Sequence, residues 1–155
     1  KGATLIVFSD DMDKALASFV LANGAAATGK EVTMFFTFWG LSVIKRRERV
    51  RAPKDFMGRM FGLMLPKHPG ALSLSKMNFG GLGPAMMRGR MKRQNVDAIE
   101  TMIAAAKAAG ARLVACQMSM DIMGVKREEL IDGVEIGGVA SYMEAADGAN
   151  VNLFV

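Results

Sequence analysis

Short apolar runs alternate along this chain with segments in which apolar residues recur every three or four positions. The runs ATLIVF (3–8), EVTMFFTF (31–38) and ARLVAC (111–116) have the length and composition of strands buried on both faces of a parallel sheet. Two sets of apolar residues have the spacing of one helix face. The first is Met12, Leu16, Phe19, Val20 and Ala27. The second is Val96, Ile99, Met102, Ile103 and Ala106. These patterns predict two long helices, the first capped by Ser9 or Asp10 and ended by Gly29, the second ended by Gly110.

The last third of the chain continues the alternation in shorter pieces. KREELID predicts a short helical turn, GVEIGG a short strand, VASYMEAAD a helix and VNLFV (151–155) a closing strand. Strands that alternate with helices imply right-handed crossovers and a sheet covered on both faces. We therefore predict one α/β domain over residues 1–155, a flavodoxin-like three-layer sandwich with a mostly parallel sheet of about five strands.

One stretch differs from the rest in charge and composition. Residues 45–93 carry 13 Lys and Arg against two acidic residues, a net charge of +11, whereas the remainder carries 7 basic and 13 acidic residues, a net charge of −6. The stretch also holds all 4 prolines and 7 of the 14 methionines. We interpret it as a long basic Met/Gly/Pro-rich insertion. Its apolar part, DFMGRMFGLML (55–65), predicts contact with another subunit or a partner, with a lid over Cys116 or a peripheral contact to anionic lipid as the alternatives.

Composition excludes several classes of protein. A single cysteine rules out an internal disulfide, and a single histidine, His68, leaves no Cys/His metal cluster, so we expect no metal and no cofactor. The start of the chain lacks the pattern of a signal peptide, and no apolar stretch reaches the roughly 18 residues of a membrane span, so we predict a cytoplasmic location. The glycines of NFGGLGPAMMRG do not follow a strand, and no nucleic-acid-binding motif is present, so nucleic acid is not an expected partner.

The carboxyl ends of the predicted strands bring three polar segments to one edge of the sheet. These are SDD (9–11), TFWG (37–40) and CQMSMD (116–121). We predict Cys116 as the reactive residue, with a pocket of supporting residues: Asp10, Asp11, Thr37, Trp39, Gly40, Met118, Ser119 and Asp121. A short helix beginning near Ser119 would favour a thiolate, and Asp121 would oppose it by like-charge repulsion. The structural alternatives are a buried inert cysteine, aspartates that cap a helix, and Trp39 and the methionines as packing residues.

Four stretches resemble a known family: LVACQMSMDIMG, TFWGL, LSKMNFGGLG and EIGGVASYMEAA. Together they make the chain similar to the DsrE/DsrF-like family, in the branch related to sulfur-relay sulfurtransferases and sometimes labelled peroxiredoxin-like. By this resemblance Cys116 corresponds to the cysteine that carries sulfane sulfur as a persulfide and passes it between partner proteins. Because Cys116 is the one cysteine present, a mechanism with an internal resolving disulfide is excluded.

Two functions follow as hypotheses. The first is a sulfur carrier or sulfurtransferase that exchanges sulfane sulfur with donor and acceptor proteins or low-molecular-weight persulfides. The second is a non-catalytic binding or assembly module, including a membrane-peripheral one, in which Cys116 is structural. In both we expect a homo-oligomer, because the apolar residues of 55–65 would otherwise form a large exposed patch.

Overall fold

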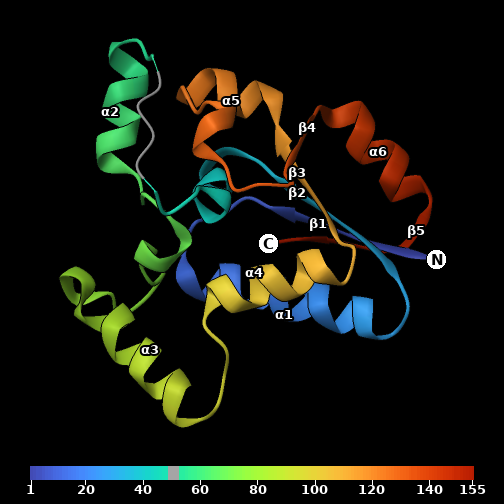
Figure 1. The fold of residues 1–155 in the computed structure, drawn as a ribbon, viewed down its shortest axis with the longest axis horizontal. Helices are drawn as coiled ribbons and strands as arrows, with labels where there is room; N and C mark the ends of the chain where they lie inside the picture. Colours follow the sequence, from blue (N-terminus) through green and yellow to red (C-terminus); the bar gives the residue numbers. More distant parts are fainter. Residues whose placement is uncertain (49–52) are drawn as a thin grey trace.

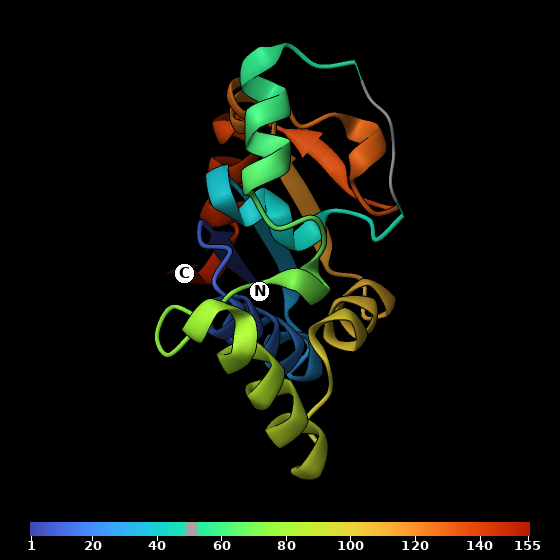
Figure 2. The same cartoon turned by 90° about the vertical axis from the view of Figure 1, so that its left-hand side faces the viewer.

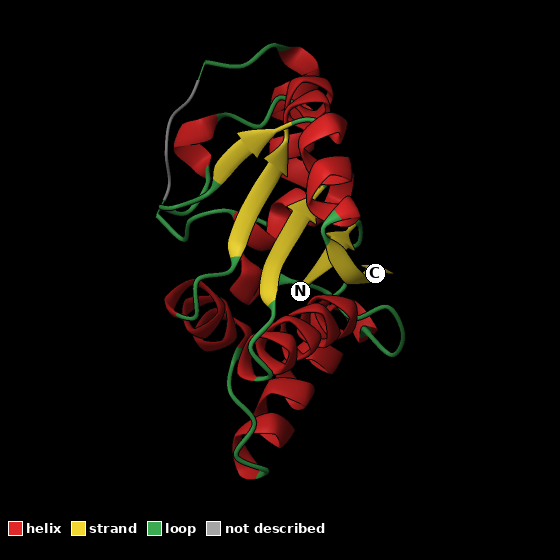
Figure 3. Cartoon of the chain, turned by 90° about the vertical axis from the view of Figure 1, so that its right-hand side faces the viewer, coloured by secondary structure: helices red, strands yellow, loops and turns green. Residues whose placement is uncertain are grey.

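Five strands form one all-parallel sheet in the computed structural model, which describes residues 1–48 and 53–155. They are β1 (Gly2–Val7), β2 (Glu31–Phe36), β3 (Arg112–Cys116), β4 (Glu135–Gly137) and β5 (Ala149–Phe154), in the order β4-β3-β2-β1-β5. The first four strands are added in one direction, and the chain then returns to the free side of β1 for the last one (Figure 3). The sheet, with helices on both faces, confirms the predicted α/β fold.

The two faces of the sheet are covered unequally. On one face α1 (Met12–Ala27) and α4 (Ile99–Ala108) pack against each other and against the strands, whereas α6 (Val139–Asp147) lies on the opposite face (Figure 1). The main core lies under α1 and α4, where the rings of Phe19 and Phe36 stack with centroids 6.2 Å apart. Since successive strand residues point to opposite faces, Phe35 lies on the α6 side, in a small cluster with Val114 and Cys116.

Two helices, rather than a long loop, occupy much of the connection from β2 to β3. After the 3₁₀ segment η1 (Phe38–Ile44) come α2 (Phe56–Met64), the 3₁₀ turns η2 (Pro69–Ala71) and η3 (Phe79–Gly81), and α3 (Leu82–Arg93). The carboxylate of Asp55 caps α2 by accepting the backbone N–H of Gly58 at 2.7 Å. In Figure 2, α2 and α3 lie at opposite ends of the molecule. The basic stretch is therefore built mainly as two separate helices, and its residues 49–52 lie outside the described residues.

The remaining helical elements are short and lie between β3 and β4. They are α5 (Gln117–Met123), which begins directly after Cys116, and the 3₁₀ turn η4 (Arg127–Glu129) within the predicted KREELID turn. Within the described residues, no helix combines the length and the apolar character that a membrane crossing needs.

Some element boundaries and burial expectations were wrong. The N-cap of α1 is Asp11, not Ser9 or Asp10, and the Ser9 hydroxyl accepts the Asp11 N–H at 3.1 Å. The second long helix begins at Ile99, so Val96 precedes it and is exposed. Val20 is also exposed, because α1 buries the side that carries Ala15, Phe19 and Ala22. Helical spacing identified both helices but was less accurate for where they begin and for which side of α1 is buried.

Candidate functional site: Cys116 and the carboxyl edge of the sheet

Cys116 ends β3, pairs with Gly137 of β4 and provides the N-cap of α5. Its side chain is only 2% exposed and packs with Phe35 and Val114. The partly buried ring of Tyr142, from α6, packs against the same cluster, with its centroid 5.5 Å from that of Phe35. Cys116 thus lies at the strand end, in a cluster against which an aromatic side chain of a later helix packs.

Tyr142 is held over this cluster by a hydrogen-bond chain. The Thr4 hydroxyl donates to Asn152 Oδ1 at 2.6 Å, which leaves the Tyr142 hydroxyl, 3.0 Å from Thr4 Oγ1, as the donor to Thr4. No residue of α6 is fully buried. The helix that packs against this cluster therefore buries less of its side-chain surface than α1 or α4. Sequence reasoning missed Tyr142, although the alternation of β2 and β3 could have indicated that Phe35, Val114 and Cys116 share a face.

A hydrogen bond joins two of the predicted supporting residues. Thr37, which follows β2, and Ser119, in the first turn of α5, have hydroxyl oxygens 2.8 Å apart. Ser119 is fully buried, and the backbone N–H of Thr37 also bonds to the carbonyl of Val7 at 3.1 Å. These bonds connect the ends of β1 and β2 to α5, the helix that follows Cys116.

Gly40 is positioned by backbone contact rather than by a role toward the thiol. Its N–H donates to the carbonyl of Phe8 at 2.9 Å. A Cβ at this position would lie 2.0 Å from the carbonyl oxygen of Val7, so only glycine fits. Gly40 thereby sets the distance between η1 and the end of β1.

Asp10, Asp11 and Trp39 line a separate cavity of about 420 Å³ at the same edge. Burial raises the pKa of Asp10, and the neighbouring Asp11 raises it further, while Lys45 acts in the opposite direction. The Asp11 carboxylate lies 3.3 Å from the ammonium of Lys14. Cys116 does not line this cavity, so the structure gathers these three residues without placing them against the thiol.

Met118 and Asp121 lie on the outer side of α5. Met118 is half exposed, and the Asp121 carboxylate accepts a hydrogen bond from the side-chain amide of Gln117 at 2.9 Å. Neither belongs to the cluster around the thiol.

Over residues 1–48 and 53–155 there is no group of three or more His, Cys, Asp or Glu side chains that could hold a metal ion.

Lys45 is a buried charge that the sequence reasoning did not single out. It follows η1 and is 6% exposed, and its pKa is lowered by burial and by Lys54, against the opposing effects of Glu129 and Asp10. Lys54 and Glu129 form an ion pair at 2.6 Å. The position of Lys45 after an apolar run gave no signal of burial, because lysine is ordinarily exposed.

Comparisons with known proteins agree along the whole chain. Residues 1–154 match the model of the DsrE/DsrF/DrsH-like family. The chain is 44% identical over 155 residues to the uncharacterized protein YrkE of Bacillus subtilis, covering 100% of this chain and 97% of the relative. It is 33% identical over 156 residues to the sulfur carrier protein DsrE2 of Allochromatium vinosum, covering 100% and 98%.

Solved structures share the fold at low sequence identity. The ychN protein from E. coli superposes with a TM-score of 0.56 at 13% identity, covering 100% of both chains. The protein of unknown function MTH1491 from Methanobacterium thermoautotrophicum gives a TM-score of 0.54 at 12% identity, covering 99% of this chain and 97% of that one. The family match and the relatives confirm the resemblance recognised in the sequence: this chain belongs to the DsrE/DsrF/DrsH-like family.

Proposed function

We propose that the protein is a sulfur carrier or sulfurtransferase that relays sulfane sulfur as a persulfide on Cys116. The observation that carries the proposal is the position of the chain's one cysteine at the carboxyl end of β3, in a relative of a sulfur carrier protein. Ligands of open α/β sheets bind beyond this edge.

The chemistry requires one thiolate and two exchanges. The Cys116 thiolate attacks the outer sulfur of a donor persulfide, the S–S bond of the donor breaks, and the donor leaves as a thiolate. An acceptor thiolate then attacks the outer sulfur of the Cys116 persulfide, and its S–S bond breaks to return the Cys116 thiolate. Each step exchanges one S–S bond for another, so no net oxidant or reductant is consumed. A reducing compartment such as the cytoplasm suits this cycle, because it keeps competing disulfides rare.

Because Cys116 is buried, the proposal includes a movement of α6, whose Tyr142 packs against the cluster around the thiol, that lets a donor reach Cys116. Since no residue of α6 is fully buried, displacement of Tyr142 exposes Cys116 without opening the main core. Thr37 and Ser119 then position the start of α5, while Gly40 holds η1 beside it. The cavity of Asp10, Asp11 and Trp39, with Met118 and Asp121 on α5, forms the surrounding surface that a donor or acceptor protein contacts.

Intact mass spectrometry after incubation with polysulfide tests the proposal. We expect the wild type, but not Cys116→Ser or Cys116→Ala, to gain the mass of one or more sulfur atoms. Dithiothreitol should remove the added mass, which separates a persulfide from a sulfinic acid of nearly equal mass, because sulfinic acid resists thiols. Unmodified wild type, or a thiol-resistant adduct, would leave the structural cysteine of the assembly-module hypothesis as the better account.

We also propose a homo-oligomer whose contacts include part of residues 55–91. In support, α2 exposes Phe56, Leu63 and Met64, each by more than three quarters of its surface, and α3 exposes Leu82 and Met86. Light scattering should give a mass above that of one chain, and Phe56→Ser with Leu63→Ser should lower it. Val139→Ser, which removes an exposed apolar residue from α6, is the matched control. A monodisperse monomer at working concentration contradicts this assembly.

A further inference from the structure

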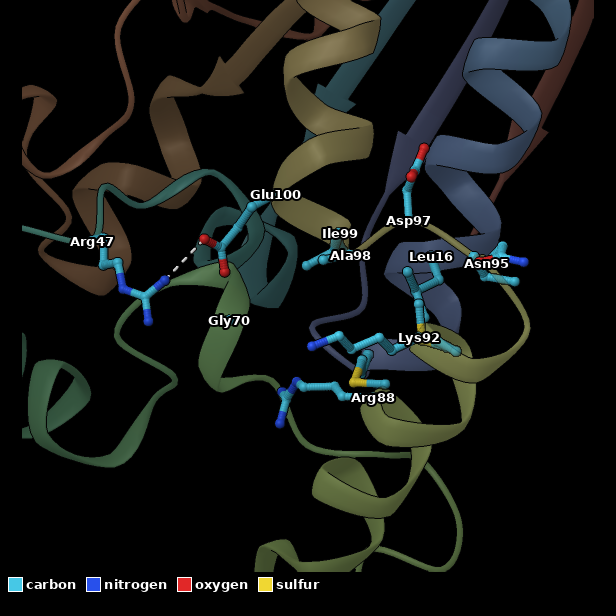
Figure 4. A pocket seen from close by; sticks show the side chains of 13 residues that line it. Leu16, Arg47, Gly70, Arg88, Lys92, Asn95, Asp97, Ala98, Ile99 and Glu100 are labelled. Atoms are coloured by element: carbon cyan, nitrogen blue, oxygen red, sulfur yellow. Dashed lines mark hydrogen bonds and ion pairs between the residues drawn. The ribbon is translucent and has the colours of Figure 1, made fainter.

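A cavity of about 550 Å³ lies between α1, α3 and the start of α4 (Figure 4). Its walls include Met12, Leu16 and Ile99, which belong to the side of the sheet covered by α1 and α4. Cys116 and Tyr142 lie on the opposite side of the sheet. The cavity is therefore distinct from the cysteine site.

Two cations of α3 face this cavity without an acidic partner. Arg88 and Lys92 both line it and are four residues apart, a spacing at which like charges on one helix repel each other. None of the ion pairs among the described residues involves either side chain. Arg88 donates one hydrogen bond to the carbonyl of Leu72 at 3.1 Å, which fixes the guanidinium and leaves its other N–H donors available.

The other charges at the cavity do not compensate these two. Arg47 and Glu100 are bonded to each other at 3.0 Å and neutralise each other. In Figure 4 the charged ends of Arg88 and Lys92 point toward the side of Gly70 and Glu100, whereas the carboxylate of Asp97 points away from them. An excess of positive charge is thus directed into one part of the cavity.

Apart from Asn95, the rest of the lining is apolar. Met12 and Ile99 are buried, and Leu16 and Met91 are partly buried against the core beside them. Pockets of several hundred Å³ with apolar walls and a few convergent polar groups are the usual form of small-molecule sites. The cationic end of the cavity favours a ligand with an anionic head group, and the apolar wall favours a ligand with a hydrocarbon body.

We propose that this cavity binds a soluble amphipathic anion, with its carboxylate, phosphate or sulfonate head between Arg88 and Lys92 and its hydrocarbon body against Met12, Leu16 and Ile99. The first turn of α4, whose N-cap Ala98 provides no side-chain acceptor, also favours negative charge at this end.

Decanoate, below the concentration at which it forms micelles, is a suitable probe in an NMR titration of the ¹⁵N-labelled full chain. We expect saturable shifts of the amides of Leu16, Lys92 and Ile99. Arg88→Gln and Lys92→Gln should each weaken binding about three- to tenfold. Arg90→Gln is the matched control, because Arg90 is an exposed cation of the same helix that does not line the cavity. Neutral decanol should bind about tenfold or more weakly than decanoate.

Three results would overturn the site: no saturable shifts, shifts concentrated on α2 or α6, or equal weakening by Arg90→Gln. Val96→Trp, which places a large side chain at the rim of the cavity, should block decanoate without removing a charge. Cys116→Ser should bind decanoate like the wild type. The titration and the persulfide measurement therefore fail independently.

Discussion

The two faces of the sheet differ in how firmly they are covered. Under α1 and α4, large side chains such as Phe19, Phe36 and Leu5 are almost completely buried, whereas α6 buries no residue fully and β5 leaves Phe154 67% exposed. Cys116 belongs to the thinly covered face. Low-stability elements are the parts of a protein that open locally while the rest stays folded. The firmly covered face therefore holds most of the buried core, and the thinly covered face is the side from which we propose that the thiol is reached.

The largest expected difference between the two faces is in stability. Phe36→Ala removes a ring from the main core and should lower the free energy of unfolding by about 3–5 kcal/mol. Tyr142→Ala should cost no more than about 2 kcal/mol, because its ring is only partly buried and its hydroxyl makes one bond to Thr4. Urea denaturation of both variants measures the difference. Equal losses would show that α6 belongs to the cooperative core.

Removing Tyr142 should expose the thiol. We expect Tyr142→Ala to increase the alkylation rate of Cys116 by iodoacetamide about tenfold, since an opening that costs about 1.4 kcal/mol less changes a population by that factor. Met143→Ala is the control, because Met143 is the next residue of α6 and is half exposed. If both variants react at the wild-type rate, the route to Cys116 does not pass through α6.

At the carboxyl edge of the sheet, the hydrogen bond between the Thr37 and Ser119 hydroxyls connects the end of β2 to α5. Ser119→Ala leaves the Thr37 hydroxyl without this partner and should cost about 1–3 kcal/mol. The double variant Thr37→Val with Ser119→Ala should cost less than the sum of the single variants, because the two groups act as one unit. Additive losses in urea denaturation would contradict a coupled pair.

The smallest effects should come from two aspartates near the start of α1, and they should have opposite signs. Because burial and Asp11 raise the pKa of Asp10, the folded state loses stability as pH rises through the range above 3.8, so Asp10→Asn should stabilise the protein at neutral pH. For Asp13, burial acts to raise the pKa, but hydrogen bonds from Ser75 outweigh it and lower the pKa. Asp13→Asn should therefore destabilise the protein above about pH 4 and have little effect at lower pH.

Thermal unfolding of the two variants between pH 3 and pH 7 checks these signs. Both differences from the wild type should shrink as the pH falls below 3.8, the ordinary aspartate value, because the carboxyls are then increasingly protonated. Destabilisation by Asp10→Asn at neutral pH would show that burial does not raise the pKa of Asp10, and stabilisation by Asp13→Asn would contradict the effect of the Ser75 hydrogen bonds on Asp13.

Much of the fold was predictable because local patterns were strong. The helix over VASYMEAAD matches α6 residue for residue, and the three long apolar runs became β1, β2 and β3. The helices α2 and α3 were not predicted, because Gly and Pro within GLGPAMMRG and FMGRMFGLM obscure helical spacing. At the site, Cys116 was predicted at a strand end, whereas Tyr142 was not, because its contact joins segments that are distant in the sequence.

The sequence by itself determined the alternation of strands and helices, the charge of residues 45–93 and the position of Cys116 at the end of β3, since each depends on composition or short-range spacing. Only the tertiary structure decided that Tyr142 packs against the cluster around Cys116, that Lys45 is buried, and that Arg88 and Lys92 line a cavity beside α1 and α4. Burial and charge pairing are decided by which residues meet across the fold. For residues far apart in the chain, such contacts depend on how the helices pack on the sheet.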